Sequence, residues 1–377
     1  MVYVVGLLSL VFLVLAILVL TRLTSILKGV NAGDTTEEIE RIGGTGNRVN
    51  AFLFIGFFVV GAIAVAWSFL HARQYFLPEA SSPHGRHTDG LFWLVMAIIT
   101  IAFVVTNALL FFFAYKYQYR KGHKATYYPE NHKLELIWTV IPAVVMALLV
   151  FTGWRAWRDI TSEAPENALN IEIVGRQFNW EMRYPGVDNN KLGNYNYKLI
   201  DANNVIGLDL EDEASFDDVT TSTEMHIPVN RPVLLKIRAR DVLHSVFIPH
   251  MRVKMDAVPG MPTRFWFIAD KTTDEMRNET GNPDFKYEIA CTEVCGQGHF
   301  SMRTTLVVED EESYNKWMAQ QKPWLTKNPD YLARVPDKLK AKAAKYIPAD
   351  AGAQAPSDST AAPAEEGAGA APSAALR

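Results

Sequence analysis

Long apolar stretches separated by polar links dominate the chain up to Arg155. The four stretches cover residues 2–20, 49–70, 91–115 and 136–154. A helix that crosses a membrane needs about 20 predominantly apolar residues. A surface helix of a soluble protein would instead carry polar residues along its exposed face. The pattern therefore predicts four transmembrane helices.

The lysines and arginines of the links predict how these helices are oriented. The link 116–133 contains five basic residues and a single acid, Glu130. Because basic links stay on the cytoplasmic side, we expect 21–48 inside, 71–90 outside, and everything after Trp154 outside. The first stretch could also be a cleaved signal peptide, but it lacks a basic start and a small-residue cleavage pattern. We expect it to be retained as a helix.

From about Leu169 the periodicity changes to short runs in which apolar and polar positions alternate. These runs cover residues 170–175, 224–229, 233–239, 264–269, 285–290 and 304–309. Alternation, β-branched and aromatic residues, and intervening turns predict an all-β sandwich or small barrel of roughly 140 residues. Between the runs, residues 201–218 carry seven acids and no base. They form either a solvated loop or an electrostatic landing patch for a basic partner.

The C-terminal part is predicted to contain a short helix at about 312–321 and then a polar tail. Residues 349–377 are rich in Ala, Pro, Ser and Gly, which cannot fill a core, so we expect disorder there. The predicted division of the chain is 1–48 (first helix and cytoplasmic loop), 49–90 (second helix and external loop), 91–158 (helix hairpin), 165–325 (β domain) and 326–377 (disordered tail).

Composition narrows the function of the β domain. The chain is 49% hydrophobic with a formal net charge of -4, so nothing points to nucleic acid. Its two cysteines, Cys291 and Cys295, are four residues apart. A disulfide scaffold would scatter its cysteines, so this pair belongs to one local site or forms a single local disulfide.

Soft and imidazole ligands surround this cysteine pair. His299 and Met302 follow in the same strand-to-loop segment, and His244 lies directly after the run 233–239. Thiolates and a thioether favour Cu(I), and imidazole suits copper in either oxidation state. A single electron-transfer copper needs only one cysteine, whereas two thiolates can bridge two copper ions that each take one histidine. The pattern therefore predicts a binuclear copper site completed by Met302 and a backbone carbonyl.

Other chemistries fit this segment less well. Tetrahedral zinc would use two cysteines and two histidines but has no use for Met302. Haem attachment requires Cys-x-x-Cys-His, which differs from the spacing here. A thiol redox pair belongs to a βαβ fold that the pattern does not predict. His226 and His250 flank prolines at strand ends and are expected to be surface or packing residues.

The motif Cys291-x-Glu-x-Cys-Gly-x-x-His-x-x-Met302, with an upstream His-Ser, resembles the binuclear CuA centre of cytochrome c oxidase subunit 2. The segment 134–142 (Leu-Glu-Leu-Ile-Trp-Thr-Val-Ile-Pro) is similar to the second membrane helix of that family. The segment 256–260 (Asp-Ala-Val-Pro-Gly) is similar to the family sequence after its first copper histidine. The resemblance covers about residues 75–310 and implies a cupredoxin-like domain.

The resemblance implies a role for each ligand. The side chains of His244, Cys291, Cys295, His299 and Met302 would bind two copper ions, and Glu293 would bind through its backbone carbonyl. The Glu293 side chain would reach magnesium (or manganese) at the interface with the catalytic subunit, where Asp256 would help through water.

Two further positions have implied roles in charge transfer. Glu135 resembles the acid at the cytoplasmic mouth of a proton path, although a carboxylate there also caps a helix. The family often has Gln-Trp-x-Trp, with the first Trp receiving electrons. This chain has Phe178 at that position, so Phe178, Trp180 or another surface group would take its place. The two helices before residue 91 exceed the family's two-helix core and imply further membrane partners.

The resemblance implies subunit 2 of a bacterial terminal oxidase, in the inner membrane with its copper domain in the periplasm. Cytochrome c, or a cytochrome domain, would supply electrons that pass to haem in the catalytic subunit of this proton-pumping complex, where oxygen becomes water. A quinol oxidase subunit would have lost the copper ligands, which are present here. A copper-delivery or assembly protein is the alternative; it would more often bind one Cu(I) and would not need Met302.

Overall fold

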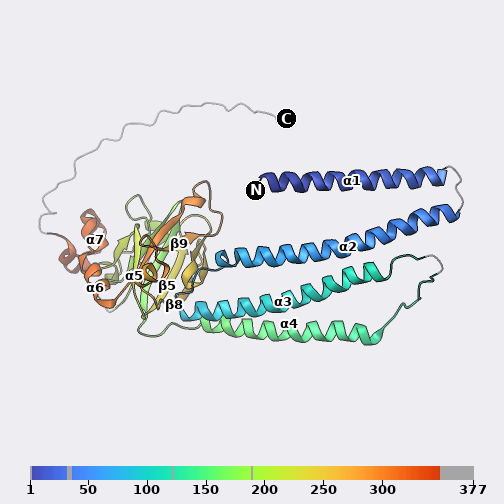
Figure 1. Ribbon diagram of the computed structural model, residues 1–377. Helices are drawn as coiled ribbons and strands as arrows, with labels where there is room; N and C mark the ends of the chain where they lie inside the picture. Colours follow the sequence, from blue (N-terminus) through green and yellow to red (C-terminus); the bar gives the residue numbers. More distant parts are fainter. Residues whose placement is uncertain (1, 32–35, 121–122, 188–189, 349–377) are drawn as a thin grey trace, which may run out of the picture. The chain divides into compact units, whose positions relative to one another are not determined.

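The computed structural model describes residues 2–31, 36–120, 123–187 and 190–348. Four long helices form from the apolar stretches (Figure 1): α1 (Val2–Asn31), α2 (Thr36–Ala72), α3 (Pro83–Lys116) and α4 (His132–Ile160). Among the described side chains, three segments are long and apolar enough to cross a membrane, namely Gly46–Tyr75, Pro83–Lys116 and His132–Ile160. These confirm three predicted spans. In α1 the described apolar segment is the shorter Ser9–Thr21, because the side chains before Ser9 lie outside the described residues.

Side chains at the helix ends explain where α3 and α4 begin. Ser82 accepts a hydrogen bond from Gly85 N at 3.1 Å, and Pro83 occupies the first helical position. Asn131 accepts one from Leu134 N at 3.0 Å. Both caps satisfy backbone N–H groups that have no partner within the helix. The two helices therefore begin where the polar links end.

The β domain consists of two five-stranded sheets, as the alternating runs predict. One sheet has the order β3-β2-β1-β5-β8 and the other β4-β10-β9-β6-β7. The bounds are β1 (Leu169–Arg176), β2 (Asn179–Tyr184), β3 (Val219–Thr221), β4 (Glu224–Pro228), β5 (Pro232–Ala239), β6 (His244–Ile248), β7 (Val253–Ala257), β8 (Thr263–Ile268), β9 (Tyr287–Cys291) and β10 (Arg303–Glu309). Fully buried side chains such as Ile173, Phe267 and Tyr287 form the core. This is the predicted cupredoxin-like sandwich.

Short segments at strand ends form one compact unit with the long helices. Residues 248–253 and 267–271 belong to this unit, and the other described strands belong to a second one. Ser81 N donates to His250 O at 2.8 Å, and Asp270 N donates to Ser81 O at 3.1 Å. Ser82 Oγ also donates to Met251 O at 3.0 Å. Backbone hydrogen bonds thus fix the start of α3 within its unit.

The predicted disordered tail is wrong for residues 326–348. After α6 (Glu311–Gln320), which confirms the predicted short helix, the chain forms α7 (Trp324–Lys327), η6 (Pro329–Arg334), α8 (Asp337–Ala343) and η7 (Ala344–Tyr346). Trp324, Leu325 and Tyr331 are buried there in one cluster with Leu208 and Phe216. The Lys-rich composition of this stretch predicted disorder, but its few apolar side chains are buried against a distant segment of the chain. Residues 349–377 lie outside the described residues.

That distant segment is the acidic segment 201–218, and some of its acids bind other parts of the chain. Asp218 is buried and accepts hydrogen bonds from Arg183 at 2.8 Å and from Gly193 N at 3.1 Å. Asp201 accepts from Tyr331 at 2.6 Å and from Arg334 at 2.8 Å. These acids attach the segment to the sheet and to the C-terminal helices. Asp201 and Asp218 are therefore occupied within the chain, whereas the side chains of Glu211 and Glu213 are exposed.

Candidate metal centre

Strand pairing brings the upstream histidine to the cysteines. β6 and β9 are antiparallel neighbours, with Val246 opposite Cys291. His244 is the first residue of β6 and Cys291 the last of β9. Thr292 N donates to Ser245 O at 3.1 Å, and Cys291 N donates to Met302 O at 3.0 Å. The loop that follows β9 is therefore held against the start of β6 and the start of β10.

The predicted ligand atoms converge at this point. The Sγ atoms of Cys291 and Cys295 are 3.9 Å apart. His244 Nδ1 is 3.8 Å from Cys291 Sγ, and His299 Nδ1 is 3.6 Å from Cys295 Sγ. Met302 Sδ lies 3.8 Å from Cys295 Sγ. All five predicted side-chain ligands are thus brought together.

A backbone oxygen completes the donor set. The carbonyl oxygen of Glu293 is 3.2 Å from Cys291 Sγ. Both cysteines are free, and their sulfur atoms are far beyond the roughly 2.05 Å of a disulfide bond. The alternative of a local disulfide is therefore wrong for this structure.

Four of the donor residues are buried, whereas His299 is half-buried and Glu293 is exposed. His244, Cys291, Cys295 and Met302 are all buried, and Met302 is only 1% exposed. Burial, followed by the neighbouring Cys291, raises the pKa of the Cys295 thiol to about 11. A cation that replaces thiol protons would relieve the cost of holding thiolates in such a site.

An aspartate that the sequence did not single out orients His244. Asp241 Oδ1 lies 2.9 Å from His244 Nε2, which leaves Nδ1 facing the thiols. Gln177 N donates to Asp241 Oδ2 at 2.8 Å, and Gln177 Nε2 donates to Cys295 O at 2.6 Å. Partners of this kind fix the tautomer and ring orientation of a metal-binding histidine. The only sequence signal was an acid three residues before the histidine, which is too common to be informative.

Two glycines allow aromatic and imidazole rings to come close. A Cβ on Gly175 would lie 2.8 Å from His244 Cδ2, and a Cβ on Gly298 would lie 2.5 Å from Phe178 Cγ. Phe178 is 39% exposed and covers the ligand loop. Trp180 is fully buried, with its ring centroid 5.9 Å from that of His244. Of the two aromatic candidates for electron entry, Phe178 lies at the surface and Trp180 is buried in the domain.

The acids with implied roles lie outside the thiol cluster. Among the described residues, the group of histidines, cysteines and acids close enough to hold one ion is His244, Cys291 and Cys295. The side chains of Glu293 and Asp256 are exposed.

The remaining singled-out side chains make packing and capping contacts. His226 stacks on Trp317 with centroids 4.2 Å apart, and the His250 carbonyl accepts the bond from Ser81 N. His226, which also pairs with Glu224 and Glu309, is therefore a packing residue, as expected. For the His250 side chain this stays a prediction. Glu135 Oε1 accepts from Asn131 N at 3.4 Å, and Oε2 lies 3.2 Å from His132 Nδ1. That is the geometry of a helix-capping residue.

Family comparisons match both parts of the chain. Residues 169–310 match the family model for the periplasmic domain of cytochrome c oxidase subunit II, and residues 70–155 match the model for its transmembrane domain. The chain belongs to the cytochrome c oxidase subunit 2 family. It is accordingly a copper-binding subunit of a cytochrome c oxidase, with membrane helices and a periplasmic domain.

Individual relatives agree with this assignment. The alternative cytochrome c oxidase subunit 2 of Bradyrhizobium diazoefficiens is 34% identical over 234 residues, which are 61% of this chain and 77% of that one. Subunit 2 of Cereibacter sphaeroides is 28% identical over 251 residues, covering 62% of this chain and 74% of that one. The solved periplasmic domain of subunit II of cytochrome oxidase of Bradyrhizobium japonicum is 26% identical, with a TM-score of 0.29, covering 42% of this chain and 95% of that one.

The donor chemistry fits copper better than zinc. A buried thioether beside a thiol is a soft ligand that copper uses, whereas structural zinc sites are built from thiolates, imidazoles and carboxylates. Met302 is therefore the residue that decides between the two metals.

Removing the carboxylate that orients His244 tests this geometry. We expect Asp241→Ala to lower copper affinity by about 10–100-fold, as is typical when the hydrogen-bond partner of a metal-binding histidine is lost. Asp241→Asn keeps an acceptor oxygen and should lose less. Competition with a copper chelator measures both variants. Equal affinity of Asp241→Ala and the unaltered protein would show that Asp241 does not support the site.

Proposed function

We propose that this chain holds a binuclear copper centre, takes up electrons one at a time from cytochrome c, and passes them to haem in the catalytic oxidase subunit, where oxygen is reduced to water. The residues that would hold the copper ions are His244, Cys291, Glu293 (through its carbonyl), Cys295, His299 and Met302. The observation that carries the proposal is the pair of free thiols 3.9 Å apart, each with its own imidazole neighbour.

The number of donors favours two ions over one. A mononuclear electron-transfer site uses two histidines, one cysteine and a weak axial methionine. This site adds a second buried thiol and a nearby carbonyl oxygen to that set. Two bridging thiolates would leave one imidazole for each ion, with Met302 and the Glu293 carbonyl as additional ligands. Copper bound in this way supplies one-electron redox chemistry.

The surrounding residues would keep the ligands still during electron transfer. Asp241 holds His244 by a hydrogen bond, Gln177 holds the Cys295 carbonyl, and Gly175 lets the histidine ring pack closely. Ligands that are already in place need little rearrangement when the charge of the site changes. The chain would therefore contribute ligands that are already held in position.

Copper content and electron paramagnetic resonance test the binuclear assignment on the purified full chain. We expect two copper ions per chain and a spectrum in which the unpaired electron is shared between them. Cys295→Ser should lose the shared signal and bind at most one ion, because no second thiolate remains to bridge. His226→Gln, which alters a packing histidine, serves as the matched control. One copper in the unaltered chain would favour the copper-delivery alternative.

Phe178 is the group through which we propose that electrons enter. It lies at the surface over the ligand loop, whereas Trp180 is buried. Phe300, beside His299, is 86% exposed and is the competing candidate. We expect Phe178→Leu to slow copper reduction by reduced cytochrome c roughly tenfold, equivalent to about 1.4 kcal/mol of barrier, with copper content unchanged. Phe178→Trp should retain the rate.

Stopped-flow mixing with reduced cytochrome c measures these rates, and Phe300→Leu is the comparison. A slow Phe300→Leu together with a fast Phe178→Leu would assign the electron path to Phe300. Unchanged rates in both would place the path at another surface group.

Glu135 in α4 and the exposed acids Glu293 and Asp256 have further proposed roles. Glu135 would take up protons at the mouth of a path into the catalytic subunit. Glu293 and Asp256 would bind magnesium at the subunit interface. In the assembled oxidase, Glu135→Gln should lower turnover while electrons still reach the copper. If Glu135 only caps α4, the same variant would lower stability and leave turnover intact. Manganese substitution, read by electron paramagnetic resonance, tests the magnesium site.

The proposed location is the bacterial inner membrane, with the 165–325 domain in the periplasm and the link 116–133 in the cytoplasm. Five basic residues in that link support this orientation. The segments 1–48 and 49–90 precede the 91–158 hairpin and would contact additional membrane subunits. Protease added to spheroplasts should digest the copper domain and spare the cytoplasmic link. Protection of the domain would reverse the topology.

A further inference from the structure

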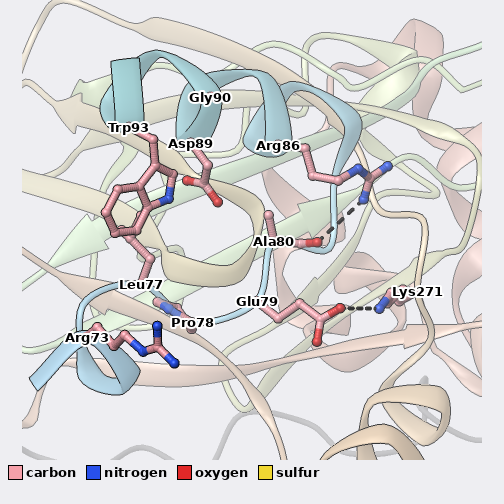
Figure 2. Close-up of a pocket in the computed structure, with 10 residues that line it drawn as sticks. All are labelled: Arg73, Leu77, Pro78, Glu79, Ala80, Arg86, Asp89, Gly90, Trp93 and Lys271. Carbon is pink, nitrogen blue, oxygen red and sulfur yellow. Dashed lines mark hydrogen bonds and ion pairs between the residues drawn. The ribbon is translucent and has the colours of Figure 1, made fainter. Parts of the chain in front are cut away.

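A charged cavity lies beside the ends of two membrane helices. Its volume is about 610 Å³, and its lining includes Arg73, Glu79, Arg86, Asp89, Trp93 and Lys271 (Figure 2). Arg73 follows α2, whereas Arg86, Asp89 and Trp93 belong to the first turns of α3. The entire lining belongs to the unit that contains the helices. The cavity has no part in the copper site.

Around this cavity, ion pairing leaves the positive charge of Arg73 without a carboxylate partner. Lys271 Nζ is 2.6 Å from Glu79 Oε1, and Arg252 Nε is 2.7 Å from Asp89 Oδ1. Arg86 pairs with Asp270. Each of these carboxylates thus already has a cation. Among the described residues, the Arg73 guanidinium takes part in no hydrogen bond or ion pair.

The position of the cavity corresponds to the boundary of the bilayer. The apolar span Gly46–Tyr75 ends beside Arg73. Trp93 is 43% exposed, and its ring contacts Phe69 with centroids 6.4 Å apart. Tryptophan and arginine are the residues that membrane proteins place at headgroup depth. Below the charges, the helices present exposed apolar side chains to the surroundings.

We propose that this cavity binds the headgroup of an anionic glycerophospholipid, with its phosphate on Arg73 and its acyl chains along α2 and α3. A phosphodiester carries one negative charge, which would match the positive charge that ion pairing leaves on Arg73. A guanidinium binds phosphate through two parallel hydrogen bonds. A zwitterionic lipid would also bring an ammonium group, for which the cavity has no unpaired carboxylate. The charge of the site therefore selects an anionic lipid.

The bound lipid would connect two parts of the membrane region. The family model for the transmembrane domain begins at residue 70, so nearly all of α2 precedes it, while α3 lies within it. α2 and α3 already contact each other through rings such as Phe58 and Phe111, whose centroids are 5.1 Å apart. A lipid held by Arg73 and Trp93 would add a contact at the headgroup end. Such a lipid would help attach α2 to the helices that the family model covers.

Lipid binding to the purified full chain in a neutral detergent tests the proposal. The probes are phosphatidylglycerol, phosphatidylcholine and inorganic phosphate, and native mass spectrometry measures lipid retained per chain. We expect the unaltered chain to retain phosphatidylglycerol in preference to phosphatidylcholine. Arg73→Gln should weaken phosphatidylglycerol binding at least about tenfold, because a charge-assisted bidentate contact is lost. Arg155→Gln removes an exposed arginine at the end of α4 and should have no effect.

Fluorescence supplies a second measurement at the same site. Phosphatidylglycerol brominated on its acyl chains should quench the fluorescence of Trp93. Trp93→Phe should therefore lose the component of quenching that saturates at the lowest lipid concentration. Equal binding by Arg73→Gln and the unaltered chain, equal retention of phosphatidylcholine, or displacement by inorganic phosphate would overturn the proposal. Copper content, measured on each variant, reports folding and the copper site separately from the lipid site.

Discussion

The antiparallel pairing of β6 with β9 is the constraint on which the site depends. With Val246 opposite Cys291, the first residue of one strand and the last of the other lie at the same end of the sheet. A shift of one residue would turn every side chain of the strand to the opposite face and would remove His244 from the thiols. The loop after β9 returns into β10 and supplies the other ligands, so the strand register of one sheet decides the geometry of all of them.

The second sheet turns a group of ligands into an ordered site. β1 contributes Gly175, which leaves room for the ring of His244, and β2 contributes Trp180, which packs against that ring. The turn between these strands carries Gln177 and Phe178 over the ligand loop. The second sheet thus packs against the ring of His244, and its β1–β2 turn covers the loop that carries the other candidate ligands. A single sheet would bring the donors together without holding their orientation.

Charged groups in the helical unit follow a different constraint, because the bilayer excludes unpaired charge. Near the ends of α2 and α3 the carboxylates are matched by arginine or lysine, and backbone bonds from Ser81 fix the loop between the helices. Arg73 stands apart from this pairing, beside the end of the apolar span Gly46–Tyr75. At the candidate metal centre, contacts within the chain orient the donors, whereas the Arg73 guanidinium at the cavity has no partner among the described residues.

Local sequence determined the parts of this protein that depend on neighbouring residues. Uninterrupted apolar runs determine the helices, alternation determines the strands, and the spacing from Cys291 to Met302 places four side-chain ligands in one loop. His244 was also predictable, since it follows a recognisable strand. Tertiary structure alone decided that Asp241 orients His244 and that Phe178 is exposed while Trp180 is buried. It also decided that Asp201 and Asp218 bind arginines and a C-terminal tyrosine of the same chain. Those outcomes depend on contacts between residues far apart in the chain, and periodicity and spacing record only near neighbours.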